Sequence, residues 1–301
     1  MFRADNSNVI EVPLKTRRIQ QVSQMVYAQV MGKGQQNISL SMELFVPRQK
    51  NKVPAVLFIT GGQFIYANKD SCVQLRMNLA EAGYVVASIN YRTAPQAVFP
   101  EPLQDVKAAI RYLRRRADDF HIDSKRIAVV GESAGGYLAA MAGVTNGIAD
   151  FDCGEDLAYS SSVQAVVDLY GPSDLRGVGA DFSPELCRLY HSSGAAEALW
   201  VNGIGAFGGT DGGVLADAEK TDRANPVHYI TADAPPFLLM HGDQDRQVSP
   251  SQTMLLYQAL REKHVEAVHF TLLGAGHGGI HWVQPAIFSI IKVFLEKHIG
   301  H

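Results

Sequence analysis

The 301-residue sequence predicts an α/β fold in which a mostly parallel central sheet of about eight strands is covered by helices on both faces. Short β-rich segments alternate with segments of helical length and spacing along most of the chain. The segment "VPAVLFIT" (53–60) is almost continuously apolar, which is typical of a strand buried on both faces. A chain of this length that is 47% hydrophobic can bury one large core, so we expect a single domain over residues 1–301.

The first two strands are expected to be antiparallel, because "MVYAQV" (25–30) and "ISLSMELFVP" (38–47) alternate in polarity. After residues 53–60, helices and strands alternate. The further expected strands are 84–90, 126–131, 163–171, 236–242 and 266–273, and the expected helices are 70–82, 100–120, 134–145, 250–263 and 282–298. Residues 172–226 break this rhythm, because they are rich in Gly, Ala and Ser and carry scattered aromatic residues. We interpret this stretch as an irregular, partly helical insertion.

Composition excludes several kinds of protein. The formal net charge of −3 provides no basic field for nucleic acid, and no apolar run reaches the ~18 residues of a membrane helix. The first residues lack an apolar signal core, so a cytoplasmic location is expected unless a leader has been removed. Cys72, Cys153 and Cys187 show neither a disulfide pattern nor zinc spacing, and we interpret them as small buried side chains. No metal or cofactor is expected.

A nucleophile motif follows the expected strand 126–131. "GESAGG" (131–136) has the pattern G-x-S-x-G, which places Ser133 on a tight turn between a strand and a helix. Small neighbours are required there because the turn brings chain against chain. The N–H of Ala134, directly after the serine, is a candidate donor to an oxyanion. The competing interpretation is a glycine-rich helix start with a capping serine.

A serine hydroxyl needs a base, and His277 is the candidate. It lies in "LLGAGHGGIHW", just after the last expected strand, and it fits the chain order serine, acid, histidine. His281, four residues later at the start of a helix, is the alternative.

The acid should follow an earlier strand than the histidine. "LLMHGDQDRQVSP" contains Asp243 and Asp245, and "YGPSDL" contains Asp174. Aspartates often cap turns, which is the competing role for Asp243 and Asp174. Asp245 is favoured because a loop needs a few residues beyond its strand to return towards the base.

Five segments now resemble one family: "FITGGQFIYANKD", "SINYRTAPQAVFPEPLQDVKAAIRYLR", "GESAGGYLAA", "NPVHYITADAPPFLLMHGDQDRQVSPSQT" and "GAGHGG". Together they are similar to the α/β-hydrolase serine carboxylesterases of the HGGG group, which includes hormone-sensitive-lipase-like and acetyl- and feruloyl-esterase-like enzymes. The resemblance covers about residues 25–300. It implies a triad of Ser133, Asp245 and His277 and oxyanion donors at Gly62, Gln63 and Ala134.

The segment "TGGQ" (60–63) departs from the family pattern. Thr60 stands in place of the family's first histidine, and Gln63 in place of its third glycine. The donors are backbone N–H groups, so these side-chain changes need not remove them. We expect Gln63 to direct its N–H at the oxyanion with φ below zero, where a non-glycine residue is unstrained.

The resemblance implies a serine carboxylesterase that hydrolyses short-chain acyl or aryl esters through an acyl-enzyme, including acetyl or feruloyl esters of plant carbohydrates. The insertion 172–226 is expected to cap the site, and its aromatic residues either line an acyl or sugar pocket or only form the core of the cap. An exopeptidase or arylformamidase on the same fold is the alternative enzyme. A catalytically silent ligand-binding receptor is the alternative of another class. Exposed last strands and helices often pair in this fold, which would give a homodimer.

Overall fold

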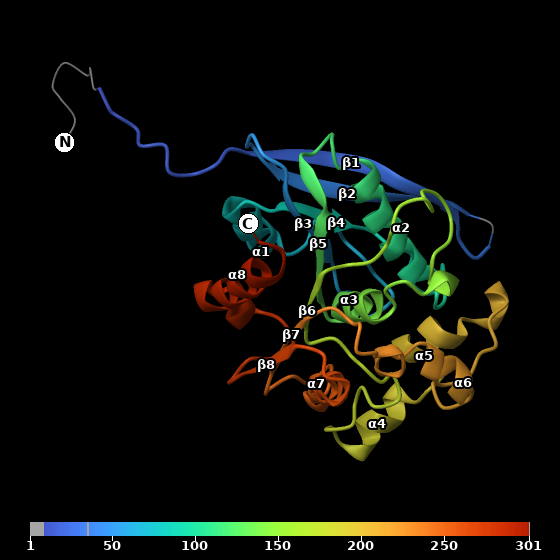
Figure 1. Ribbon diagram of the computed structural model, residues 1–301. Helices are drawn as coiled ribbons and strands as arrows, with labels where there is room; N and C mark the ends of the chain where they lie inside the picture. The colour runs from blue at the N-terminus through green and yellow to red at the C-terminus, as the bar shows by residue number, and fades with distance from the viewer. Residues whose placement is uncertain (1–8, 35, 301) are drawn as a thin grey trace.

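The computed structural model describes residues 9–34 and 36–300 (Figure 1). In this part of the chain, eight strands form one sheet in the order β1-β2-β4-β3-β5-β6-β7-β8. The strands are β1 (Ile19–Met31), β2 (Asn37–Pro47), β3 (Val53–Ile59), β4 (Val85–Ile89), β5 (Ile122–Glu132), β6 (Ala165–Leu169), β7 (Phe237–Gly242) and β8 (Ala267–Leu272). β2 pairs antiparallel with β1 and with β4, and the other neighbours are parallel. The predicted fold class is therefore confirmed.

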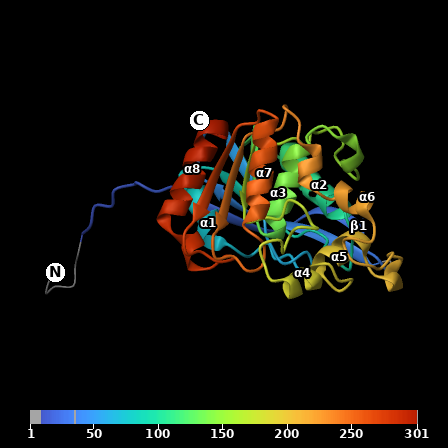
Figure 2. The same ribbon diagram turned by 90° about the horizontal axis from the view of Figure 1, so that it is seen from below.

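Helices cover both faces of the sheet, as Figure 2 shows for α1 and α8 on one face and α2, α3 and α7 on the other. The α-helices of the described residues are α1 (Val73–Ala82), α2 (Glu101–Arg115), α3 (Ala134–Val144), α4 (Pro184–Tyr190), α5 (Ala196–Asn202), α6 (Ala218–Arg223), α7 (Ser251–Glu262) and α8 (Pro285–Ile299). Short 3₁₀ helices are η1 (Ala149–Phe151), η2 (Gly205–Phe207), η3 (Pro226–Tyr229) and η4 (Ile280–Val283). None of the helices described is long and apolar enough to cross a membrane.

The two-sided burial follows from the strand sequence. Along β3, Leu57 packs into the core beneath α2 and α3, whereas its neighbours Val56 and Phe58 pack into the core beneath α1 and α8. Successive side chains of a strand point to opposite faces, so a strand covered on both sides must be apolar at every position. All seven residues of β3 are buried, as the continuous apolar run predicts.

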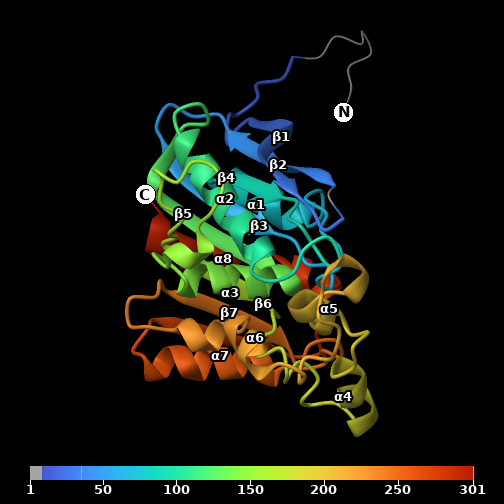
Figure 3. The same cartoon turned by 90° about the vertical axis from the view of Figure 1, so that its right-hand side faces the viewer.

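The insertion between β6 and β7 contains α4, α5 and α6, which lie together beside α3 and α7 (Figures 1 and 3). Each of the two expected roles is taken by one of its aromatic residues, and a third takes neither. Trp200 is fully buried and packs against Phe64 and Tyr137, with ring centroids 4.7 and 6.0 Å away. Tyr190 instead lines a pocket, and Phe207 is exposed. This aromatic cluster and hydrogen bonds such as that from the Tyr137 hydroxyl to the carbonyl of Ala224 fix the insertion to the main body.

The three cysteines are free thiols. Their interpretation as small buried side chains is wrong for Cys153, which is exposed in the loop after η1, and Cys72 and Cys187 are only half-buried. The spacing of isolated cysteines carries no information on burial, because burial depends on which distant segments cover them.

Candidate active site

The backbone at Ser133 is strained. Ser133 lies between β5 and α3 with φ 53° and ψ −125°, outside the regions that L-residues normally occupy. Glycine is required on both sides, because a Cβ on Gly131 would lie 2.0 Å from the carbonyl oxygen of Gly135, and a Cβ on Gly135 would lie 2.0 Å from that of Ile59. This turn presents the serine side chain at the carboxyl end of β5.

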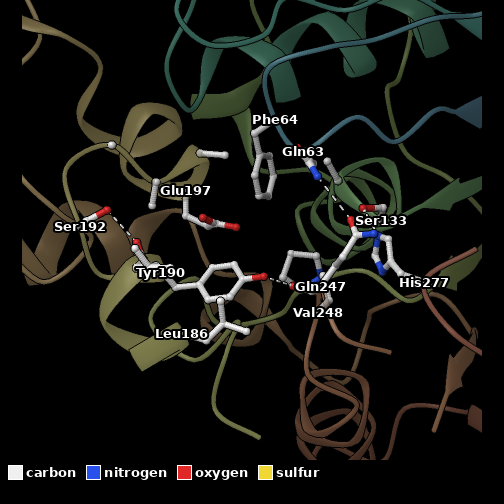
Figure 4. A pocket seen from close by; sticks show the side chains of 16 residues that line it. Gln63, Phe64, Ser133, Leu186, Tyr190, Ser192, Glu197, Gln247, Val248 and His277 are labelled. Atoms are coloured by element: carbon white, nitrogen blue, oxygen red, sulfur yellow. Dashed lines mark hydrogen bonds between the residues drawn. The ribbon is translucent and has the colours of Figure 1, made fainter. Parts of the chain in front are cut away.

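The structure brings Ser133, His277 and Asp245 together in one hydrogen-bonded series. His277 Nε2 lies 2.8 Å from Ser133 Oγ, and His277 Nδ1 lies 2.7 Å from Asp245 Oδ2. The three residues follow β5, β8 and β7, whose carboxyl ends meet at one edge of the parallel sheet. Figure 4 shows His277 beside Ser133 at one end of a pocket.

Four hydrogen bonds hold the Asp245 carboxylate. His241 Nε2 lies 3.1 Å from Oδ2, which also accepts from His277, and the N–H groups of Gln247 and Val248 donate to Oδ1 over 2.8 and 3.0 Å. Burial raises the pKa of Asp245, but the hydrogen bonds from His241 and His277 outweigh burial and hold the pKa well below its usual range. His241 was not predicted, although it stands in the same "HGDQD" segment.

The alternative acids and base lie elsewhere. Asp243 is exposed and its Oδ1 accepts a 2.6 Å hydrogen bond from the N–H of Gly274. Asp174 accepts from Asn225 Nδ2 over 2.9 Å at the base of the insertion, and His281 is exposed in η4. In the described residues none of the three bonds to the serine, the histidine or Asp245. Among the described residues, no group of three or more His, Cys, Asp or Glu side chains has the arrangement to hold a metal ion.

The glycines of "TGGQ" permit a close approach of two loops. A Cβ on Gly61 would lie 2.9 Å from the Cβ of Ser133, and one on Gly62 would lie 2.1 Å from the carbonyl oxygen of Tyr66. Gly62 also has φ 142°, which side chains disfavour. Thr60, which stands before them, is buried, and its carbonyl accepts a 2.8 Å hydrogen bond from the Tyr91 hydroxyl. The glycine loop therefore packs directly onto the nucleophile turn.

Three N–H groups near Ser133 are available to a ligand. Within residues 9–34 and 36–300, the backbone N–H groups of Gly62, Gln63 and Ala134 donate to no carbonyl or side chain. Gly62 and Gln63 belong to the glycine loop, and Ala134 is the first residue of α3.

The expected negative φ of Gln63 is wrong. Gln63 has φ 53° and Phe64 has φ 62°, so two consecutive non-glycine residues are left-handed. The reason is tertiary: the Phe64 ring is 2% exposed and packs between Tyr137 and Trp200, so the chain must turn sharply inward at this point. The strain of the loop is compensated by burial of an aromatic ring.

Glu132 and Tyr170 support the site from behind, and neither was predicted. Glu132 Oε2 accepts a 2.7 Å hydrogen bond from the Tyr170 hydroxyl, and Oε1 accepts from the N–H of Gly61 at 3.5 Å. The Tyr170 ring also packs edge-on against His277, with ring centroids 4.8 Å apart. Burial and the nearby Glu132 carboxylate raise the pKa of Tyr170, so its hydroxyl keeps the proton that it donates. The only sequence signal was the place of Glu132 inside G-x-S-x-G.

Two pockets adjoin Ser133. The first has a volume of about 330 Å³ and extends beneath the insertion, which contributes Leu186, Tyr190 and Glu197 (Figure 4). The second, of about 430 Å³, opens on the side of the glycine loop. Gln63 and Gln247 line both, and Gln63 Nε2 donates to Gln247 Oε1 over 3.4 Å. Both pockets therefore open at Ser133 and His277, which line the two of them.

The sheet order, the strained serine turn and the histidine and aspartate from later strand ends define an α/β-hydrolase. The chain belongs to the BD-FAE family, whose model matches residues 42–260. It is 32% identical over 229 residues to esterase LipC of Mycobacterium tuberculosis, an alignment that covers 75% of this chain and 53% of LipC. The chain thus spans about half the length of the curated relatives it matches.

Two solved structures are similar over nearly the whole chain. A truncated form of a carbohydrate esterase from gut microbiota has a TM-score of 0.79 at 27% identity, covering 95% of this chain and 98% of that one. A bifunctional GH43-CE protein of Bacteroides eggerthii has a TM-score of 0.76 at 26% identity, covering 93% of this chain and 35% of that one.

Proposed function

We propose that the protein is a serine carboxylesterase that cleaves esters through an acyl-enzyme intermediate. The observation that carries the proposal is the hydrogen-bonded series of Ser133, His277 and Asp245, with atoms 2.8 and 2.7 Å apart, beside N–H groups that have no protein acceptor in the described chain. Membership of the BD-FAE family and similarity to esterases support the same class of reaction.

In the proposed first step, Ser133 Oγ attacks the ester carbonyl carbon while His277 Nε2 accepts its proton. Asp245 accepts the hydrogen bond from Nδ1–H, so the unprotonated Nε2 faces the serine. The same carboxylate stabilises the imidazolium that forms. The protonated His277 then donates its proton to the leaving alcohol, and Ser133 carries the acyl group.

The second step reverses these roles. His277 takes a proton from water, the resulting hydroxide attacks the acyl-enzyme, and the carboxylic acid leaves with restoration of Ser133. Both steps pass through a tetrahedral oxyanion. We assign its stabilisation to the N–H groups of Gly62, Gln63 and Ala134, because preorganised donors in a water-poor site stabilise developing charge strongly.

The proposed substrates are short-chain acyl esters, including acetyl or feruloyl esters of plant carbohydrates. A pocket of about 330 Å³ is at the small end for ligand sites, which favours a small group over a long acyl chain. The similarity to a structure described as a carbohydrate esterase supports the sugar component. We assign residues 172–226 as a cap within one domain spanning residues 1–301, because the insertion supplies one wall of this pocket.

The test is labelling with a serine-directed phosphonate, read by mass spectrometry, together with hydrolysis of p-nitrophenyl acetate. We expect one adduct on Ser133 and a loss of ~10⁴-fold or more in kcat for Ser133→Ala. Ser192→Ala is the matched control, because Ser192 lines the same pocket and its hydroxyl bonds, among the described residues, only to the carbonyl of Leu189. Normal turnover by folded Ser133→Ala would rule out this nucleophile.

The same assays separate the alternatives. Faster cleavage of an aminoacyl anilide or an N-formyl arylamine than of any ester would indicate an exopeptidase or an arylformamidase. A wild-type protein that forms no adduct and turns over none of these substrates would be a silent receptor.

A further inference from the structure

Glu197 is a buried acid that faces the pocket, and no other residue of the described ranges 9–34 and 36–300 bonds to its carboxylate. It is the second residue of α5, is only 7% exposed, and points into the space between Phe64 and Tyr190 (Figure 4). Its carboxylate takes a hydrogen bond from its own backbone N–H. In the described part of the chain no cation, hydroxyl or amide of another residue bonds to it. A glutamate is rarely this deeply buried unless a charged group pairs with it, so this one requires an explanation.

Its place at a helix start does not explain it. Glu185 is likewise the second residue of its helix, α4, and takes a hydrogen bond from its own N–H, but it is exposed and lies 3.3 Å from Arg188. The hydrogen bonds from its own N–H, from Ser183 and from Arg188 lower the pKa of Glu185, whereas burial raises the pKa of Glu197 to about 7. Glu197 therefore destabilises the folded state at any pH at which it is ionised, whereas an apolar side chain at this site would not destabilise it.

The surroundings of Glu197 indicate what it binds. Phe64, Leu186 and Tyr190 give the pocket aromatic and aliphatic walls, against which a ring can pack. A carboxyl group between such walls provides a strong hydrogen-bond acceptor for a donor on that ring. The simple donor that an uncharged ester substrate can carry is a hydroxyl group.

We propose that Glu197 determines specificity by accepting a hydrogen bond from a hydroxyl group on a ring of the ester substrate. The hydroxyl belongs either to a sugar that forms the alcohol part or to a phenol that forms the acyl part. The proposal rests on the esterase function proposed above. Glu197 contacts the substrate away from the reacting carbonyl, so its effect depends on the hydroxyl and not on the ester bond.

The experiment compares two matched pairs of esters. Monoacetylated methyl xyloside carries free hydroxyl groups on the alcohol ring and cyclohexyl acetate carries none, whereas methyl p-coumarate and methyl cinnamate differ in the phenolic hydroxyl of the acyl group. At pH 8, where Glu197 is ionised, Glu197→Ala should lower the preference for the hydroxylated member of one pair by ~10- to 100-fold in kcat/KM, the value of a hydrogen bond to a charged acceptor. The pair of esters whose preference falls shows whether the hydroxyl belongs to the alcohol part or to the acyl part of the substrate.

Two further variants separate this role from structural damage. Glu197→Gln keeps an acceptor oxygen in the same place, so it should retain more of the preference than Glu197→Ala does. Glu185→Ala removes the same residue type from the same helix position outside the pocket and should leave both preferences as they are. Equal losses on both members of each pair would overturn the proposal, because Glu197 would then only support the fold. A wild-type preference for a cationic ester such as aminoethyl acetate, lost equally in both Glu197 variants, would also overturn it.

Binding measurements keep this result separate from the esterase proposal. In a Ser133→Ala background the same four esters are titrated without turnover. Addition of Glu197→Ala should weaken binding of the hydroxylated member by ~10-fold or more relative to its partner. If no ester is hydrolysed by the wild type, the esterase proposal fails, and this titration still decides the role of Glu197. Equal affinities with and without Glu197 would contradict it.

Discussion

The replacement Glu197→Gln should stabilise the folded protein at pH 8 and leave its stability unchanged at pH 4. Burial raises the pKa of Glu197 from an ordinary 4.5 to about 7 in the folded protein. The folded state therefore binds this proton more tightly than the unfolded state, so wild-type stability is intact below pH 4.5 and is lost as the pH rises from 4.5 to 7. The full loss, present above pH 7, is about 3 kcal/mol at 1.36 kcal/mol per tenfold change in proton affinity. Glutamine is uncharged at every pH and avoids this loss.

Urea unfolding at a series of pH values measures the effect directly. The free energy of unfolding of Glu197→Gln minus that of the wild type should rise from near zero at pH 4 to about 3 kcal/mol at pH 8, a difference of about 5 °C in Tm for a chain of this size. Glu185→Gln is the control, and because hydrogen bonding lowers the pKa of Glu185 it should show no gain at pH 8. A difference for Glu197→Gln that does not change with pH would refute the reasoning, since it would show that Glu197 ionises equally easily in the folded and unfolded states.

Three further predictions concern the proposed reaction. Asp245→Asn should lower kcat by ~10⁴-fold, because it leaves the wrong tautomer on His277. Asp243→Asn should instead lower the free energy of unfolding by about 1 kcal/mol, because it weakens a hydrogen bond in its turn. If Asp243→Asn has the lower kcat of the two, the two assignments must be exchanged. Acetyl to butyryl aryl esters should be cleaved faster than long-chain ones, because the two pockets beside the serine are only about 330 and 430 Å³, and faster cleavage of a C12 ester would contradict this. Gln63→Gly keeps the backbone N–H and suits a φ of 53°, so kcat should fall by less than ~10-fold; a hundredfold loss would assign a direct role to the glutamine side chain.

Rules that apply to short stretches of sequence were sufficient to predict much of this structure. The alternation of strand and helix segments predicted all eight strands of the sheet, because the polarity pattern of a strand depends on which of its faces are buried. G-x-S-x-G identified the turn at Ser133, since only glycine tolerates the contacts that the turn creates. Chain order and position after a strand then selected His277 and Asp245, because parallel strands all end at the same edge of a sheet.

Contacts between distant segments decided the rest. The positive φ of Gln63 follows from the burial of Phe64 against Trp200, which is 136 residues away in the chain and belongs to the insertion. Nor does the sequence show that Glu197 is buried and Glu185 exposed, since both stand second in a short helix and burial depends on the segments that cover each one. Periodicity and turn chemistry act over a few residues, whereas the burial of a charge and the direction of a loop are set by the residues that pack against them. The sequence by itself therefore determined the sheet and the proposed reacting groups, and only the tertiary structure decided the shape and polarity of the pocket beside them.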